Sequence, residues 1–537
     1  MRFAAFLIVA LSSFGQEVAP AIQSIRKEEL KADLFFLASD SMRGRLTNTP
    51  EYKIAGEWIA SRLERLGLEP LEGETFVQTF HLVSARLGEG NRLLIGSQAS
   101  LRSARLMEEF YPLNISANGE VKGRVALAGF GIQAPEHGWD DYQGRNVKGS
   151  LVMVFEGDPQ EDSPESPFDG LVTSEHGGSL KKALVAQNQG AVALLIVSAR
   201  RDAEGPRSFP SAARTHWPQN PRIERYQLAS NIEKVRIPVI QISPALAEHI
   251  LGSDIELLRK QADRAGGAVF SMSSLPVELA TSITRTVISD RNIVAKIEGA
   301  DPKLKEEAIL ISAHYDHDGA DGERVMNGAD DNGSGTVGLL EIAEAYATAM
   351  SQNRRPKRTV IFAFWGSEER GLLGSWAWVQ NPLWPLEKTV AVLNMDMIGR
   401  NEEVPEGGGR RFRGLKPQDA AANANSVHLM GYSFNPELAE MVRQANREID
   451  LTLRMEYDNN RSNLVRRSDQ WPFLQNRVPS VFFHTGLHPD YHTPGDRPER
   501  INYPKMERIV RLVYQTSWDL ATSDKRPKMP AKRSLSD

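Results

Sequence analysis

The distribution of apolar residues divides the chain into two kinds of sequence. Between about residues 110 and 275, short apolar runs alternate with turn-rich stretches, which predicts a β-rich module. Its predicted strands are Val125–Ala128, Leu151–Phe155, Val192–Val197 and Ile237–Ile242, with one helix over Ser179–Gln189. After about residue 290 the apolar runs become nearly continuous, which is typical of parallel strands buried on both faces.

These continuous runs predict the strands of a second, larger domain. They are Asn292–Glu298, Ala308–Ala313, Thr359–Phe364, Val390–Asn394 and Ser480–Phe483. Helical patterns lie between them, as in Thr336–Met350, where apolar residues recur three and four positions apart. Alternating strands and helices predict a three-layer α/β/α domain, whose ligand site should lie at the carboxyl ends of the strands.

The α/β domain also includes residues near the start of the chain. Apolar residues recur at helical spacing from Ile54 to Leu66, and Gly67 follows as a stop signal. We therefore assign residues 24–110 and 276–523 to the α/β domain and residues 111–275 to an inserted β-rich domain. Residues 524–537 are rich in Lys and Arg and predict a mobile tail.

The first 15 residues have the layout of a secretory signal peptide. Met1 and Arg2 precede an apolar run that ends at Leu11, and small residues then place a cleavage site near Gly15/Gln16. The apolar run is too short to cross a bilayer, and no later stretch approaches about 18 continuous apolar residues. We expect a secreted or periplasmic protein with no membrane span. A buried N-terminal helix is the alternative.

The net charge and the absence of cysteine exclude several classes of partner and of active site. The chain has 537 residues, with 64 Lys and Arg against 69 Asp and Glu, a net charge of −5. This balance offers no broad positive surface, so we expect no nucleic-acid partner. The absence of cysteine excludes disulfides, thiol nucleophiles, iron–sulfur clusters and thiolate zinc sites. Any metal must therefore use His, Asp or Glu ligands.

Acidic residues and histidines follow the predicted strands of the larger domain. The candidates are His314, Asp316, Asp331, Glu368, Glu369, Asp396 and His492. Side chains at the carboxyl ends of parallel strands share one edge, and nitrogen and oxygen ligands suit zinc, manganese or cobalt. Two successive glutamates do not fit a core, so one could bind metal while the other faces a water. This inventory meets the needs of a two-metal hydrolytic centre.

The motifs that carry these residues resemble a known family. They are His314-x-Asp316, Gly328–Gly335, Glu368-Glu369, Asn394–Gly399 and Asp490–Asp496. In order and content they are similar to those of the two-zinc aminopeptidases of metallopeptidase family twenty-eight, which include aminopeptidase Y and bacterial leucyl aminopeptidases. The resemblance implies a zinc-exopeptidase fold with a mixed, mostly parallel sheet.

The resemblance also implies a role for each site residue. His314 and Asp396 would bind one Zn²⁺, Glu369 and His492 a second, and Asp331 would bridge the two ions. Co²⁺ or Mn²⁺ could replace zinc. Three further residues would act on the reaction, namely Glu368 as the general base for the bridging water, Asp316 as the acceptor that orients the His314 imidazole, and Tyr491 as a donor to the oxyanion.

The inserted module resembles a protease-associated domain, on the segments Gly129–Ile132, Asp140–Tyr142 and Gly144–Gly149. In the family such a domain is thought to shape substrate access. Gly129–Ala134 also fits a dinucleotide-binding pattern, but Pro135 stands where a phosphate-binding helix would begin.

We therefore expect a secreted two-zinc aminopeptidase acting on peptides. Carboxypeptidase, dipeptidase and glutaminyl cyclase activities on the same scaffold remain alternatives, as does a binding ectodomain without activity, although the complete ligand set argues against the last. The oligomeric state stays open. The roles of six further residues also stay open. Three histidines either contact the metal ligands or lie on the surface, namely His317, His484 and His488. Three tryptophans either line a substrate pocket or pack against a helix, namely Trp376, Trp378 and Trp384.

Overall fold

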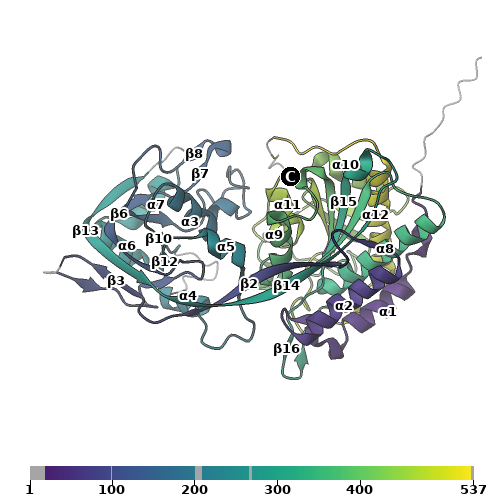
Figure 1. Cartoon of the computed structure of the whole chain (residues 1–537), viewed down its shortest axis with the longest axis horizontal. Helices are drawn as coiled ribbons and strands as arrows, with labels where there is room; N and C mark the ends of the chain where they lie inside the picture. Colours follow the sequence, from purple (N-terminus) through teal and green to yellow (C-terminus); the bar gives the residue numbers. More distant parts are fainter. Residues whose placement is uncertain (1–17, 98–99, 200–207, 265–268, 532, 534–537) are drawn as a thin grey trace, which may run out of the picture.

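The chain folds into two domains joined by two long strands. The computed structural model describes residues 18–97, 100–199, 208–264, 269–531 and 533, so the predicted signal peptide lies outside the described residues. In Figure 1 the smaller domain lies at the left and the larger at the right, with β2 (Val77–Leu87) and β14 (Ile283–Ile297) running between them. None of the helices in the described ranges is both long and apolar enough to cross a membrane.

The larger domain is built on a ten-stranded sheet of order β11-β2-β14-β18-β15-β19-β22-β20-β21, with β1 beside β14. The remaining strands are β1 (Glu69–Pro70), β11 (Tyr226–Leu228), β15 (Ala308–His314), β18 (Thr359–Trp365), β19 (Thr389–Met395), β20 (Ser426–Met430), β21 (Thr452–Arg454) and β22 (Ser480–His484). The four central strands β18, β15, β19 and β22 are parallel, whereas β14 and β20 pair with this group antiparallel. The sheet is therefore mixed, with its parallel part at the centre.

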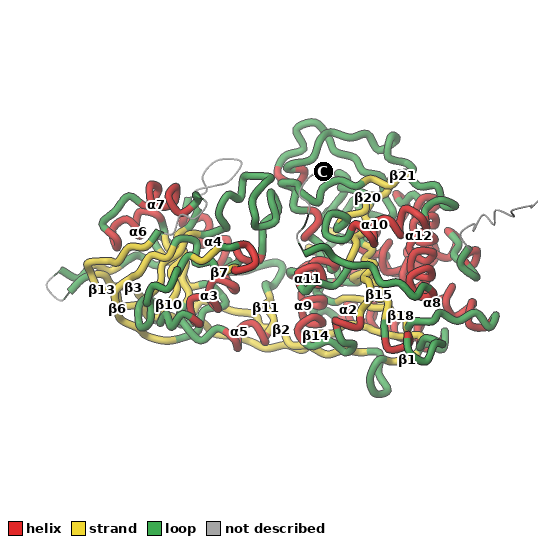
Figure 2. Tube along the Cα trace, turned by 90° about the horizontal axis from the view of Figure 1, so that it is seen from above, coloured by secondary structure: helices red, strands yellow, loops and turns green. Residues whose placement is uncertain are grey.

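Helices cover both faces of this sheet. One face carries α1 (Lys27–Leu37), α2 (Pro50–Arg65), α8 (Gly335–Ser351), α10 (Pro436–Ala445) and α12 (Tyr503–Thr522); the other carries α9 (Leu373–Gln380) and α11 (Gln470–Gln475). Figure 2 shows α9 and α11 between the main sheet and the second domain, and α8 and α12 on the far side. This arrangement confirms the predicted three-layer α/β fold.

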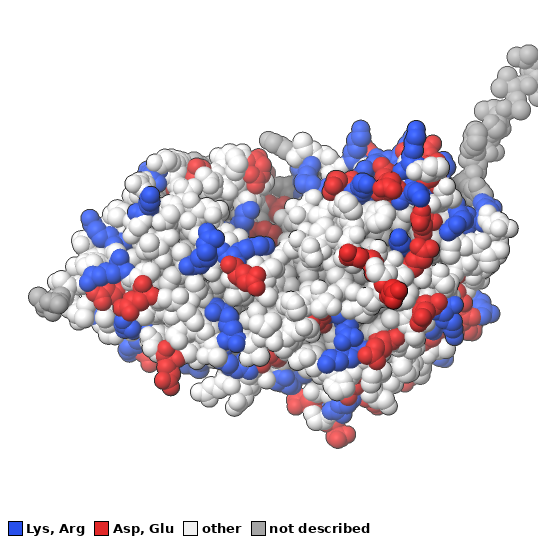
Figure 3. Space-filling model, in the orientation of Figure 1, with Lys and Arg blue, Asp and Glu red and all other residues white. Residues whose placement is uncertain are grey.

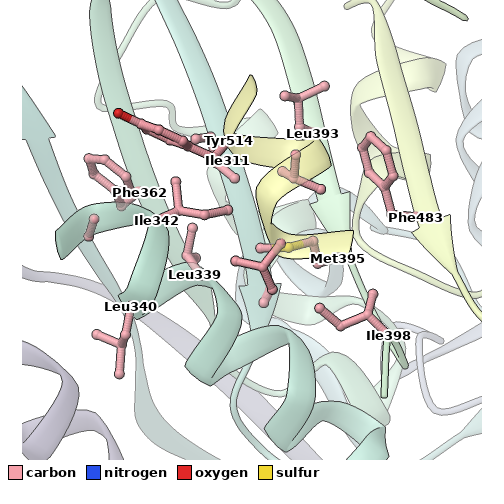
Figure 4. Close-up of a cluster of buried hydrophobic side chains, with 14 of the residues drawn as sticks. Ile311, Leu339, Leu340, Ile342, Phe362, Leu393, Met395, Ile398, Phe483 and Tyr514 are labelled. Carbon is pink, nitrogen blue, oxygen red and sulfur yellow. The ribbon is translucent and has the colours of Figure 1, made fainter. Parts of the chain in front are cut away.

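Burial on both faces explains the continuous apolar runs. Successive side chains of a strand point to opposite faces, so Ile311 of β15 packs toward α8 while Leu310 packs toward α9 and α11. Figure 4 shows the α8 side of this core, where Leu339 and Ile342 lie against the strands. Apolar residues therefore fill most of these strands, and the buried Ser312 of β15 satisfies its hydroxyl by donating to Asn394 of β19 over 2.8 Å.

The second domain contains an eight-stranded sheet of order β4-β3-β13-β6-β9-β10-β12-β5. Its strands are β3 (Arg92–Ile95), β4 (Arg102–Ser103), β5 (Phe110–Pro112), β6 (Gly119–Ala128), β9 (Leu151–Phe155), β10 (Ala193–Val197), β12 (Val239–Ile242) and β13 (Phe270–Thr281). Helices α6 (Pro244–Leu251) and α7 (Ile255–Ala262) pack on one face, and α3 (Ser179–Asn188), α4 (Phe209–His216) and α5 (Ala229–Lys234) on the other. The predicted strands and the predicted helix are present, although β6 starts six residues earlier than predicted. The prediction of a β-rich module with one helix is wrong, because α4, α5, α6 and α7 also cover its sheet.

The domain boundaries differ from the predicted residues 111 and 275. The second sheet includes β3 and β4, which precede residue 111, and β13 continues to Thr281. Conversely, β11 lies within the predicted insert but pairs with β2 in the main sheet. The boundary is hard to see in the sequence because β2 and β14 pass between the domains as long paired strands rather than as a flexible linker.

Charged side chains are interspersed over both domains, as Figure 3 shows for one face. Part of the predicted tail lies against the larger domain. The backbone N–H of Lys528 donates to Glu437 Oε2 over 3.1 Å, and the Arg533 guanidinium lies 4.0 Å from the centre of the Phe434 ring. The mobility of the tail stays a prediction.

Candidate metal centre

The five predicted metal ligands meet at the carboxyl edge of the parallel strands. His314 ends β15, Asp396 directly follows β19, and Glu369 lies in the turn after β18. Asp331 lies in the turn that precedes α8, and His492 lies in the loop after β22. The parallel alignment of β15, β18, β19 and β22 therefore brings together residues that are up to 178 positions apart in the sequence.

The ligand atoms form two groups that share Asp331. In the first group, His314 Nε2 lies 3.4 Å from Asp331 Oδ1 and 3.5 Å from Asp396 Oδ1. In the second, His492 Nε2 lies 3.0 Å from Asp331 Oδ2 and 3.5 Å from Glu369 Oε2. The two carboxylate oxygens of Asp331 thus face different groups, as a bridging ligand requires.

These separations fit two small cations. A tetrahedral ion with bonds of about 2.0–2.2 Å holds its ligand atoms roughly 3.3–3.6 Å apart. His314 Nε2, Asp396 Oδ1 and His492 Nε2 are buried and have no hydrogen-bond partner among the described residues. Buried polar atoms without partners are costly. One cation would satisfy His314 and Asp396, and a second would satisfy His492. The residues present therefore fit a pair of zinc-sized ions.

The same cluster perturbs the protonation of its carboxylates. Burial raises the pKa of Glu368 well above its usual value, and the charges of Glu369 and Asp396 raise it further. Burial also acts to raise the pKa of Asp331, but the nearby His314 and His492 imidazoles outweigh it and hold that pKa well below its usual value. Glu368 is thus the carboxylate that favours a proton, and Asp331 the one that favours its charge.

Glu368 lies beside the metal ligands and faces a pocket. Its Oε2 is 3.7 Å from His314 Nε2, and it lines a cavity of about 280 Å³ together with Asp331, Glu369 and Asp396. The other walls are mostly apolar, from Leu372, Met397, Leu464, Phe482 and Leu487, with Arg466, Arg467, His484 and Tyr491 as the polar residues. Trp376, Trp378 and Trp384 are not among the residues that line it, and Trp378 is fully buried in the core.

Asp316 and Tyr491 lie at the site in different ways. The Asp316 carboxylate accepts the backbone N–H groups of Glu368 and Glu369 over 2.9 and 3.3 Å. Its Oδ1 is 3.6 Å from His314 Nδ1, which is longer than a hydrogen bond, and the Asp316 carbonyl oxygen is nearer at 3.3 Å. The carboxylate therefore holds the Glu368-Glu369 turn more directly than it holds the imidazole. Tyr491 lines the pocket, and its ring lies 4.0 Å from that of His492.

Two aspartates support the ligands without having been predicted to do so. Asp318 Oδ2 lies 2.7 Å from His492 Nδ1, and its Oδ1 accepts a hydrogen bond from Arg370 over 2.6 Å. Asp496 accepts the backbone N–H groups of Asp330 and Asp331. Asp318 lies two residues after Asp316, and Asp496 is the last residue of the motif Asp490–Asp496. Both aspartates therefore lie in sequence segments that also contain predicted site residues.

The three histidines with open assignments are all buried beside the ligands. His317 Nδ1 lies 2.7 Å from Glu369 Oε1 and 4.0 Å from Asp331 Oδ2, which makes it a further candidate ligand. His484 Nδ1 donates to the carbonyl oxygen of Asp396 over 2.9 Å. His488 Nε2 lies 3.3 Å from Asp330 Oδ2. None of the three is a surface residue.

A buried arginine holds the loops beneath the site. The Arg45 guanidinium is fully buried and donates to the carbonyl oxygens of Leu37, Tyr315, Asn327 and Gly328 over 2.7–2.9 Å. Gly328 itself cannot carry a side chain, because its φ is +56° and a Cβ would lie 2.5 Å from the His317 ring. Arg45 thereby links the N-terminal segment to the backbone on both sides of the metal-ligand motifs.

Arg45→Met should destabilise the fold. The change leaves four buried carbonyl oxygens without their charged donor, for which we expect a loss of about 3–5 kcal/mol in the free energy of unfolding, measured by urea denaturation. Arg43→Met is the matched control, because Arg43 is exposed and donates one hydrogen bond, to Gly322 O. Equal stability of the two variants would contradict the role assigned to Arg45.

The second domain contacts the loop that carries the pocket arginines. Glu175 Oε1 accepts hydrogen bonds from Arg466 over 2.9 Å and from Trp471 Nε1 over 2.8 Å. Nearby, the backbone N–H of Thr173 donates to Asn463 Oδ1 over 2.9 Å. The loop of the second domain around residue 175 therefore supports one wall of the pocket.

Comparison with known proteins finds a family that is similar over the part of the chain that carries the site. The model of peptidase family M28 matches residues 292–517, a range that includes all five ligands. The larger domain is therefore similar to peptidase family M28 over these residues. An aminopeptidase of Pseudomonas aeruginosa is 37% identical over 129 residues, which cover 23% of this chain and 21% of that protein. A probable glutamate carboxypeptidase of Arabidopsis thaliana is 24% identical over 406 residues, covering 71% of this chain and 51% of that protein.

The alignments span about half or less of these curated relatives. Among solved structures, an aminopeptidase from Aneurinibacillus sp. strain AM-1 superposes with a TM-score of 0.49 at 17% identity, covering 95% of this chain and 97% of that one. A zinc aminopeptidase from Bacillus subtilis superposes with a TM-score of 0.44 at 19% identity, covering 95% and 98%. The M28 match lies in the larger domain and leaves most of the second domain unassigned.

Proposed function

We propose that this chain is a secreted metallo-aminopeptidase that binds two zinc ions and removes N-terminal residues from peptides. The observation that carries this proposal is the pair of ligand groups sharing Asp331, each closed by one histidine and one further carboxylate at separations of 3.0–3.5 Å. Secretion rests on the sequence of residues 1–15 alone.

His314, Asp396 and Asp331 would hold one ion, and Glu369, His492 and Asp331 the other. Zinc ions bound there would polarise the scissile carbonyl and lower the pKa of a water toward about 7. Co²⁺ or Mn²⁺ could use the same nitrogen and oxygen ligands.

The reaction also needs groups that move protons. Glu368 lies beside the ligands, faces the pocket and has a raised pKa, so it suits a base that accepts a proton from the attacking water and returns it to the leaving amine. The Tyr491 hydroxyl, in the same pocket, would donate a hydrogen bond to the oxyanion. The Asp316 carboxylate positions Glu368 through its backbone N–H.

Carboxypeptidase activity is the second candidate, because Arg467 lines the pocket and a guanidinium binds a terminal carboxylate well. Two proteins similar to this chain are also named as probable glutamate carboxypeptidases. We regard the second domain as a protease-associated domain that shapes access to the pocket, and the contacts of Glu175 with Arg466 and Trp471 support this view.

Model substrates separate the two activities. An aminopeptidase should hydrolyse aminoacyl-p-nitroanilides, lose that activity to a chelator and recover it with added zinc. It should also refuse N-acetylated peptides, because it recognises a free amine. Hydrolysis of N-acetylated peptides together with refusal of C-terminal amides would instead establish a carboxypeptidase. No hydrolysis of either substrate class in zinc-loaded protein would contradict both proposals.

Asp318→Asn should weaken zinc binding. The carboxylate fixes the orientation of His492 through Nδ1, and changes to such supporting residues typically cost about 10–100-fold in metal affinity. Competition with a chelator of known affinity measures the effect. Asp321→Asn is the matched control, because Asp321 is exposed at the end of β16 (Ala320–Asp321). An unchanged zinc affinity in Asp318→Asn would argue against this role.

A further inference from the structure

A second cluster of metal-binding side chains lies in the smaller domain, away from the M28 site. His137 ends one short turn (Pro135–His137), and His176 lies at the centre of another (Glu175–Gly177). Ligand atoms of Glu136, His137 and His176 all lie within 4.8 Å of one another. His176 Nε2 is 3.2 Å from Glu136 Oε1, and the two imidazole rings lie edge to face with centres 5.7 Å apart.

This cluster borders a large cavity between the two domains. The cavity has a volume of about 1260 Å³. Glu136, His137 and His176 line it from the smaller domain, and Arg370, Trp376 and Phe434 line it from the larger one. An ion held by three protein ligands at such a surface would keep positions open for water or another ligand.

The surroundings favour a neutral imidazole at His176. Burial and the nearby charge of Lys181 lower the pKa of His176 to about 4, against the opposing effect of Glu136. A metal ligand must be unprotonated, so His176 needs no proton loss at neutral pH. The positive charge of Lys181 opposes a cation, whereas Glu136 favours one, and the neighbouring Asp169 already pairs with Arg533 over 3.6 Å.

We propose that Glu136, His137 and His176 form a third metal site, of the two-histidine, one-carboxylate kind that binds zinc, cobalt or nickel. This site goes beyond the proposed peptidase function and does not depend on it. It has a structural consequence because His176 follows Glu175, the residue that contacts Arg466 and Trp471 of the larger domain. An ion bound by His176 would order the turn through which the smaller domain supports the pocket.

Metal stoichiometry tests the site in the full-length protein. Wild type, His137→Ala/His176→Ala and His81→Ala/His249→Ala would be dialysed against micromolar free Zn²⁺ and analysed for bound zinc. The control pair removes two exposed histidines outside the cluster. We expect the cluster variant to bind one zinc ion fewer per chain than wild type and the control. Equal zinc content in all three proteins would overturn the proposal.

The comparison stays informative if the catalytic assignment fails, because the difference of one ion per chain does not depend on how many ions bind elsewhere. Glu136→Gln covers the case in which the double variant does not fold, because this glutamate side chain is exposed and both imidazoles remain. Titration with Co²⁺, followed by visible absorption, should show that its weakest site loses at least about tenfold in affinity. An unchanged Co²⁺ titration would likewise overturn the site.

Discussion

Glu368→Gln should abolish turnover while both metal ions stay bound. The substitution keeps the shape of the side chain but removes the group that accepts a proton, and general bases of this kind contribute about 10²–10⁴-fold to the rate. Glu368 contributes no oxygen to either group of ligand atoms that shares Asp331. We therefore expect kcat on an aminoacyl-p-nitroanilide to fall by that factor, with unchanged zinc content by elemental analysis.

Glu341→Gln is the matched control for this experiment. Glu341 is a buried glutamate of α8 whose pKa burial raises to about 8, so it is mainly neutral at pH 7 and its replacement by neutral Gln changes little. It should keep both zinc and activity. A Glu368→Gln variant with wild-type kcat would exclude Glu368 as the base, and one that lost zinc would make it a ligand instead.

The centre of the fold was predictable because its strands are buried on both faces. Predicted runs such as Leu151–Phe155 and Thr359–Phe364 match β9 and β18 closely, since nothing polar interrupts them. No strand was predicted over the five-residue β20, which contains Ser426 and His428. The structure accommodates His428 through a contact of 3.0 Å with Glu402, which lies in a distant loop.

The candidate ligands were predictable for a related reason. A histidine or carboxylate at the end of an apolar run stands out, and the topology brings such ends together. The residues that orient those ligands are harder to predict from the sequence. Asp318, for example, contacts His492 only in the folded protein, because the two residues are 174 positions apart in the chain. The Asp316 carboxylate illustrates the same point, since its partners are the backbone of Glu368 and Glu369 rather than the imidazole two residues away.

The sequence also did not predict where the two domains join or how they contact each other. A boundary is visible where composition changes, but β2 and β14 keep strand-like composition through the junction and pair along 11 positions. Only the structure shows that the smaller domain reaches the wall of the pocket through Glu175. Under the proposed function, specificity should therefore depend on both domains, although the match to family M28 lies in the larger one.

Asp331→Ala should remove both ions and all measurable peptidase activity. Each oxygen of this carboxylate faces one histidine, at 3.4 Å for His314 and 3.0 Å for His492, so the change takes a ligand from both groups at once. Loss of metal assistance removes several kcal/mol of transition-state stabilisation, which corresponds to roughly a thousandfold or more in kcat/KM.

Elemental analysis and kinetics on the same sample measure both effects of Asp331→Ala. Asp321→Ala, at an exposed position, should retain zinc and activity. Asp331→Asn refines the test, because it keeps one carbonyl oxygen and should retain more zinc than Asp331→Ala while still failing to bridge. A variant that kept one ion at full occupancy would show that the two groups bind independently, and Asp331 would then serve a single ion.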